Sequence, residues 1–208
     1  MIWKSSASPR RWVRELARRV ACAGLVAAAA CGGASSDSSG DGRPAPVYDP
    51  TTGRLKELVS DRNKDSKPDL WAYMDGSRIE RIEIDRNADG RIDRWEHYGP
   101  LPAGAASDAA PPLVRAEEAN GPDDRVTRRE FYVQGVIDRV EEDADTDGRV
   151  DKWEQYSAGA LSRVDLDLQG KGFADRRLVY GPAGGVDAIE EDPDGDGRFV
   201  PVKPEAAR

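Results

Sequence analysis

Two twelve-residue segments of this chain place oxygen-bearing side chains at the same five positions. The segments are 85–96 and 143–154, which read DRNADGRIDRWE and DADTDGRVDKWE. Asp, Asn or Glu stands at positions one, three, five, nine and twelve, and Gly stands at position six. Calcium takes six to eight hard oxygen ligands, and so short a segment supplies them only when alternate side chains point inward around a sharp glycine turn. The spacing therefore predicts two calcium sites.

Four segments carry enough of this pattern to be predicted calcium loops. The two complete ones would use Asp85, Asn87, Asp89, Asp93 and Glu96 with the carbonyl of Arg91, and Asp143, Asp145, Asp147, Asp151 and Glu154 with the carbonyl of Arg149. Segment 61–72 offers Asp61, Asn63, Asp65 and Asp69 but lacks the glycine, and segment 192–203 offers Asp192, Asp194 and Asp196. Clustered carboxylates repel one another and a divalent cation reverses that repulsion, so calcium is the expected cofactor.

The loops recur with a period that covers most of the chain. Asp61 and Asp85 are 24 residues apart, as are Asp143 and Asp167, and Asp192 follows 25 residues later. A further copy begins at Ala119, which gives six copies. The copies at 119–130 and 167–178 are predicted to be metal-free, since the first has few carboxylates and the second has Lys171 at a ligand position. Ten extra residues fall in the proline-rich segment 99–112, which we expect to be an insertion loop.

The segments between the loops are too short for the two helices that flank a loop of this kind in a helical protein. Each segment that follows a loop is five to seven residues long and rich in aromatic or β-branched residues, as is typical of a strand. The segments that precede the loops have apolar residues at spacings of two and three, which is ambiguous. Glycine-containing turns at 74–77, 134–135 and 158–159 favour β-hairpins. The predicted fold is mostly β: about six 24-residue hairpin repeats in 51–203, followed by a tail at 204–208.

The loops resemble those of thrombospondin type 3 repeats, dockerins and EF-hands, all of which bind calcium through this spacing. The resemblance covers nine to twelve residues in each of four copies, so it implies the metal and not the fold. Thrombospondin repeats would imply cysteines, and dockerins would imply two loop–helix copies on a cohesin partner. The overall pattern is similar to that of repeat-bearing bacterial surface lipoproteins.

The first 30 residues have the composition of a cleaved signal peptide. Six basic residues precede the apolar segment 20–30, which at 11 residues is shorter than the roughly 20 needed to span a bilayer. The junction with Cys31 resembles a lipoprotein lipobox, although Ala28 stands where that pattern usually has Leu. We therefore expect a lipid on Cys31 and a flexible tether at 31–50, with secretion of a non-lipidated form as the alternative. Loss of six basic and one acidic residue would change the net charge from −8 to −13.

These features predict a calcium-binding, lipid-anchored protein of the cell envelope with a structural or adhesive role. The expected location is extracytoplasmic, on the outer membrane of a bacterium, and the acidic surface excludes a nucleic-acid partner. The first alternative is a module that binds a surface glycan or protein through a face of repeated aromatic residues: Trp71, Trp95, Trp153, Tyr98, Tyr132, Tyr156 and Tyr180. A hydrolase is the second alternative, but the carboxylates already fit the calcium spacing and His97 has no histidine or nucleophile partner in the sequence. We therefore expect no enzymatic activity.

Overall fold

The computed structural model describes residues 43–106, 109–120 and 123–202. These residues form thirteen β-strands and no helix, so none of them belongs to a helix that could span a membrane. The predicted fold class, a β-hairpin repeat array, is confirmed. The predicted signal peptide, Cys31 and most of the tether lie outside the described residues, as does the tail.

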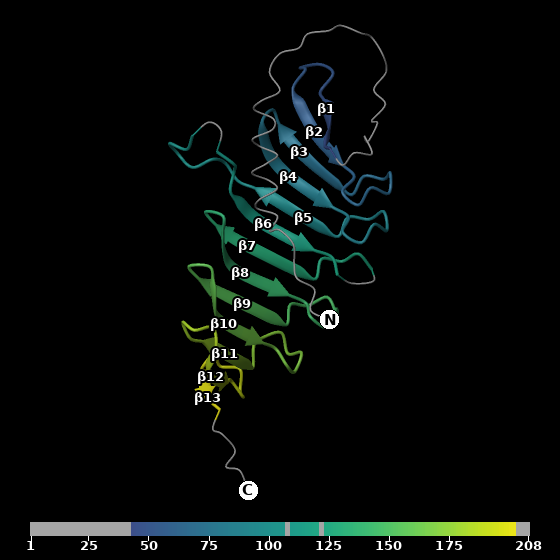
Figure 1. Cartoon of the computed structure of the whole chain (residues 1–208). Helices are drawn as coiled ribbons and strands as arrows, with labels where there is room; N and C mark the ends of the chain where they lie inside the picture. Colours follow the sequence, from purple (N-terminus) through teal and green to yellow (C-terminus); the bar gives the residue numbers. More distant parts are fainter. Residues whose placement is uncertain (1–42, 107–108, 121–122, 203–208) are drawn as a thin grey trace. The chain divides into compact units, whose positions relative to one another are not determined.

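The chain divides into two compact units, 1–112 and 113–208. In each unit the strands lie side by side in chain order, every neighbouring pair being antiparallel (Figure 1). The first unit contains β1 (Ala45–Tyr48), β2 (Leu55–Ser60), β3 (Leu70–Asp75), β4 (Arg78–Ile84) and β5 (Arg94–Tyr98). The second contains β6 (Leu113–Glu118), β7 (Arg128–Val133), β8 (Val136–Glu142), β9 (Lys152–Ser157), β10 (Ala160–Leu166), β11 (Arg176–Tyr180), β12 (Val186–Glu191) and β13 (Val200–Pro201).

Strand β1 lies inside the segment that the sequence assigns to the tether, so the strand array begins at Ala45 rather than after residue 50. The prolines at 44 and 46 hide this strand from a sequence pattern. A proline is tolerated in an outermost strand, where its missing N–H can face solvent, and Pro46 pairs with Leu58 of β2 in that position. The outermost strand of the second unit, β13, also contains a proline. Short, proline-bearing edge strands disfavour pairing with another chain.

A repeated β-bulge explains the mixed spacing in the strands before the loops. Tyr73 pairs with Arg81 and Met74 pairs with Ile79, which leaves Glu80 without a partner position. Because one residue is extra, Ile79 and Ile82 are three residues apart and still lie on the same face. The same register shift recurs at Lys56, Asp138, Ser162 and Asp187. The bulge is therefore part of the repeat.

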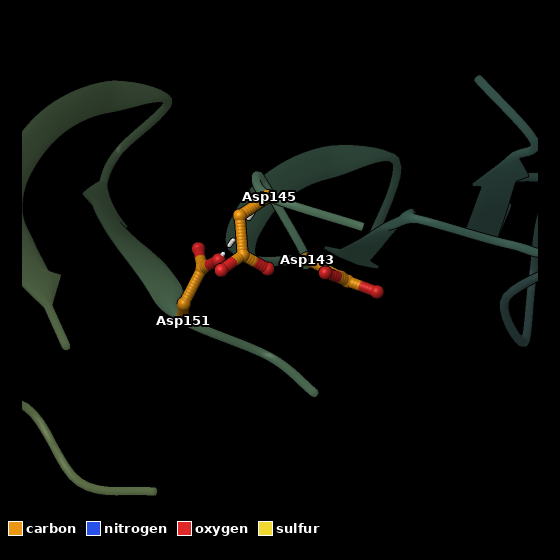
Figure 2. A group of neighbouring side chains, drawn as sticks. All are labelled: Asp143, Asp145 and Asp151. Carbon is orange, nitrogen blue, oxygen red and sulfur yellow. Dashed lines mark hydrogen bonds between the residues drawn. The ribbon is translucent and has the colours of Figure 1, made fainter. Parts of the chain in front are cut away.

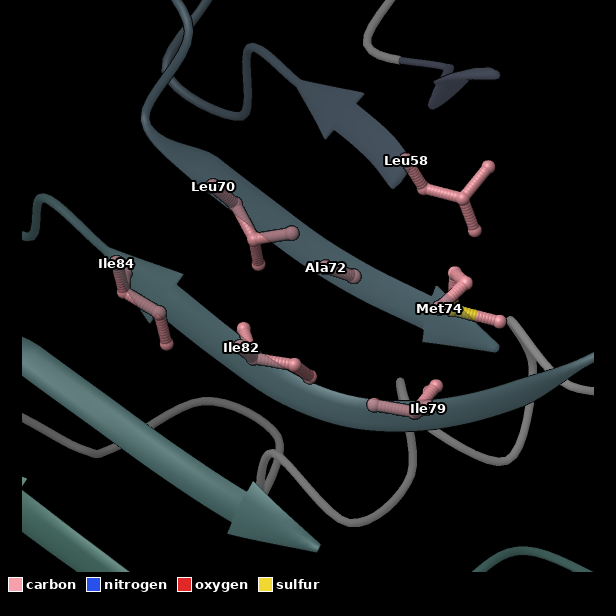
Figure 3. Close-up of a cluster of buried hydrophobic side chains, with 7 residues drawn as sticks. All are labelled: Leu58, Leu70, Ala72, Met74, Ile79, Ile82 and Ile84. Atoms are coloured by element: carbon pink, nitrogen blue, oxygen red, sulfur yellow. The ribbon is translucent and has the colours of Figure 1, made fainter. Parts of the chain in front are cut away.

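The core of the first unit is one face of strands β2, β3 and β4. Seven apolar side chains project from that face, as Figure 3 shows: Leu58, Leu70, Ala72, Met74, Ile79, Ile82 and Ile84. Tyr98 packs against this cluster. Trp71 and Trp95 both pair with Glu83. Glu83 stands between Ile82 and Ile84 in β4, so its side chain lies on the face opposite to the core. Trp71 and Trp95 therefore lie on the face of the sheet opposite to Tyr98.

Two hairpin turns in the second unit have both central residues in the left-handed region. These are Gln134 and Gly135, with φ of 51° and 76°, and Ala158 and Gly159, with φ of 49° and 82°. A left-handed residue with a Cβ costs roughly 1 to 2 kcal/mol. Ala158→Gly should therefore raise the free energy of unfolding by about 1 kcal/mol. Urea denaturation checks this, with Ala160→Gly in strand β10 as the control, which should lower stability. Equal losses in the two variants would contradict the assignment of the turn.

Candidate metal centre

The six segments that carry the calcium-type pattern are called here the first to sixth loops: 61–72, 85–96, 119–130, 143–154, 167–178 and 192–203. They connect β2 to β3, β4 to β5, β6 to β7, β8 to β9, β10 to β11 and β12 to β13. Gly99 N–H donates to the carbonyl of Pro112 at 2.9 Å, which closes the insertion 99–112 at its base. The loops thus occupy corresponding places in the repeat, despite the insertion.

The second loop shows how the backbone arranges the predicted ligands. Asp85 Oδ1 accepts from Ala88 N–H at 2.7 Å, and its Oδ2 accepts from Gly90 N–H at 2.8 Å. Asn87 Oδ1 accepts from the N–H of Asp89 at 2.9 Å. Asp89 Oδ1 in turn accepts from Arg91 N–H at 2.9 Å. The side chains at positions one, three and five are thereby held against their own loop.

The position-one hydrogen bonds recur in the other loops that have Asp at this position. The carboxylates accept from the N–H groups of Lys64 and Ser66, Asp147 and Gly148, Lys171 and Gly172, and Gly195 and Gly197. Five loops therefore share one frame. Three of the five, the first, fifth and sixth loops, depart from the sequence pattern, so the frame tolerates more variation than the pattern suggests.

Two positions in each frame have left-handed backbone, where the sequence indicates only one. Position six is left-handed at Gly90 (φ 90°) and Gly148 (96°), as its glycine predicts. In the first loop Ser66 adopts 71° at this position, so the loop forms without the glycine. Position four is left-handed as well, at Ala88 (61°) and Thr146 (64°) among others. The left-handed backbone at position four could have been predicted from Gly170 and Gly195, the glycines at that position in the fifth and sixth loops.

Position nine closes each of the first five loops. Asp93 N–H donates to the Ile84 carbonyl at 3.0 Å, and Asp93 Oδ2 accepts from Arg86 N–H at 2.9 Å. Burial raises the pKa of Asp93, an effect that the N–H group and charge of Arg86 only partly oppose. In the third loop Thr127, 6% exposed, takes this place, with Oγ1 accepting from Asn120 N–H at 3.4 Å. Sequence reasoning missed Thr127 because it searched this position for carboxylates.

The closest carboxylate groups are in the fourth and sixth loops. Asp143, Asp145 and Asp151 each have one ligand oxygen within 4.8 Å of the others, and Figure 2 shows the carboxylates of Asp145 and Asp151 next to each other. Asp192, Asp194 and Asp196 form the second group of this kind. Either set could hold a metal ion, and hard oxygen donors of this kind suit calcium. In the first and second loops position three is Asn63 or Asn87, so its oxygen belongs to an amide.

The predicted position-twelve ligands are not part of these groups. Glu96 Oε1 accepts from Arg94 Nε at 2.9 Å, and Oε2 accepts from the Tyr98 hydroxyl at 2.7 Å. Glu154 is likewise held by Lys152 Nζ at 2.8 Å and the Tyr156 hydroxyl at 2.7 Å. Position twelve lies within a strand, where Arg or Lys, Glu and Tyr at alternate positions share one sheet face. In this structure both glutamates are held on the sheet by these partners, and their role as calcium ligands stays a prediction.

The electrostatics of Glu154 agree with this placement on the sheet. Burial alone would raise the pKa of Glu154, but Lys152, the Tyr156 hydroxyl and Arg128 outweigh it and hold that pKa below its ordinary value. Burial, together with the nearby Glu154 carboxylate, raises the pKa of Tyr156 to about 12.

The remaining predicted ligands lie in the loops as the sequence places them, and their role stays a prediction. They are Asp61, Asp65, Asp69 and Asp147, with the carbonyls of Arg91 and Arg149.

Adjacent loops are linked through position nine. The N–H of Asp85 donates to the carbonyl of Asp69 in the preceding loop at 3.0 Å. The second unit repeats this bond from Asp143 to Thr127, Asp167 to Asp151 and Asp192 to Asp175, at 2.7, 2.8 and 3.0 Å. A residue at position nine therefore closes its own loop and fixes the first residue of the next.

Comparison with known proteins does not add a function. No family model and no curated protein matches the chain. Among solved structures, a chain in the crystal structure of accessory secretory protein 1, 2 and 3 of Streptococcus pneumoniae aligns with 64% of this chain at 15% identity and a TM-score of 0.29. The aligned part is 21% of that chain, and a similarity at this level carries no argument about this protein.

Proposed function

We propose that this protein binds calcium through its loops and that the bound calcium stabilises the β-hairpin array. The observation that carries the proposal is the approach of Asp143, Asp145 and Asp151 to within 4.8 Å. Two carboxylates at that separation repel each other by about 3 kcal/mol at an effective dielectric of 20, and a bound divalent cation turns this repulsion into attraction. A loop that gathers such groups with backbone hydrogen bonds is well suited to a cation.

The proposed setting is the outside of a bacterial cell, and it rests on the sequence of residues 1–31. A signal peptide followed by Cys31 supports a lipid-anchored protein of the envelope. The hairpin array would then be a calcium-stabilised surface with a structural or adhesive role. Nothing in the loop chemistry calls for catalysis, since the carboxylates are used by the loop frame and by ion pairs on the sheet.

Calorimetric titration of the protein with calcium tests the proposal. The wild-type protein should bind several ions, and Asp145→Asn should weaken one site at least about tenfold, because it removes a charged ligand from the fourth loop. Asp138→Asn is the matched control, since Asp138 is the bulge residue of β8 and lies outside the loops. Absence of calcium binding by the wild type, or equal affinities in the two variants, would contradict the proposal.

A further inference from the structure

The fifth loop contains a buried carboxylate oxygen that no group of the described chain satisfies. Asp175, at position nine, is 6% exposed. Its Oδ1 accepts from Leu168 N–H at 3.3 Å, so the carboxylate faces the loop that it closes. Its Oδ2 is buried and has no hydrogen-bond donor among the described residues. A buried, unpaired carboxylate oxygen is unfavourable, and its usual remedies are a proton or a cation.

The frame around this oxygen is the same as in the acidic loops. Asp167 is 8% exposed and accepts from the N–H groups of Lys171 and Gly172 at 3.0 and 2.6 Å. Gly170 and Gly172 take the two left-handed positions, with φ of 64° and 87°, and need no strained side chain to do so. The loop therefore presents two buried carboxylates in the usual arrangement.

Lys171 is the obvious internal cation, but its ammonium group is directed elsewhere. Its Nζ lies 5.7 Å from the centre of the Phe173 ring, on the face of that ring. The ring in turn reaches the sixth loop, where a Cβ on Gly195 would come within 2.6 Å of Phe173 Cζ. Position five of the fifth loop is thus left without a ligand, and the Asp175 oxygen is left without a positive partner.

We propose that the fifth loop is itself a calcium site, formed by Asp167 and Asp175 with neutral oxygens from the Gln169 side chain, the Phe173 carbonyl and water. The inference rests on the proposed function, because it assumes that the shared frame binds calcium. Two carboxylates and a nearby lysine attract calcium less than the four aspartates of the fourth loop. The site is therefore the weaker of the two, and it contradicts the sequence-based prediction of a metal-free copy.

Counting bound ions by calorimetry, with calcium alone as the probe and the full chain as the sample, tests the site. Asp175→Asn should remove one weakly bound ion and leave the tighter ones unchanged. Lys171→Asp changes an exposed residue by two charge units and should tighten the weakest site at least about tenfold without adding an ion. Lys56→Asp, at the exposed bulge of β2, is the control and should leave both the number and the affinity of the sites unchanged.

The outcomes separate this inference from the proposed function. An additional ion in Lys171→Asp, beyond the wild-type number, would show that the native fifth loop does not bind calcium and would overturn the inference alone. An unchanged ion count in Asp175→Asn would do the same. If Asp175→Asn does not fold, the lysine variant decides. Absence of calcium binding by the wild type would overturn both.

Discussion

Removal of calcium with a chelator is expected to lower the melting temperature by at least about 10 °C, and added calcium should restore it. Each site occupied at a hundred times its dissociation constant adds about 2.7 kcal/mol to the free energy of unfolding. One kcal/mol shifts the melting temperature of a chain of this size by about 2 to 4 °C. Several sites acting on one array therefore produce a large shift. Circular dichroism in the β region, recorded during heating with and without chelator, measures it.

Magnesium provides the control for this experiment. It demands near-ideal octahedral geometry and gives up its water reluctantly, so it should restore little of the lost stability. Equal melting temperatures with calcium, with magnesium and with chelator would refute a stabilising role for calcium. Full recovery with magnesium would instead mean that any divalent charge is sufficient.

The second large effect is expected in the core of the first unit, at Ile82. Ile82 lies in β4 and its side chain is 2% exposed. It pairs with Ala72 of β3 on one side and with Glu96 of β5 on the other. Ile82→Ala should lower the free energy of unfolding by about 2 to 5 kcal/mol. The substitution leaves a cavity that the neighbouring side chains on this face of the sheet can fill only in part. Urea denaturation followed by tryptophan fluorescence measures the change.

Ile189 is the matched control, because it occupies the same repeat position in strand β12 but is 44% exposed. Ile189→Ala should cost less than about 1 kcal/mol, since most of its surface already meets water. Similar losses at the two positions would mean that repeat position, and not burial, determines the contribution of the side chain. A loss under 1 kcal/mol at Ile82 would argue that this face is not the core.

The spacing of ligands and aromatic residues was sufficient to predict the hairpin array, because both the loop and the strands after it have local sequence signals. The secondary structure of the segments before the loops was ambiguous from the sequence. The bulge at Glu80 and its equivalents places apolar residues that are three apart on the same face of the sheet, so their spacing does not match a regular strand. A bulge has no strong residue signature, so the pairing partner must be known. Strand β1 was missed for a related reason: its prolines are permitted only by its place at the edge of the sheet.

The candidate site shows the same division. Positions one, three, five and nine belong to the local frame of the loop, and their spacing alone indicates where they lie. Position twelve belongs to the next strand, so the partners of Glu96 are Arg94 and Tyr98 on the same strand. Thr127 could not be predicted as a loop-closing residue from a ligand pattern, because its role is a hydrogen bond and not a charge.

The hydrogen bonds between successive loops bear on how such a chain can change its length. Within the second unit every repeat pairs only with the repeat before it and the repeat after it, and each junction uses the same bond from position one to position nine. Excision or duplication of one whole repeat would bring equivalent groups together and re-form the same junction. Copy number is therefore open to change by recombination of whole repeats.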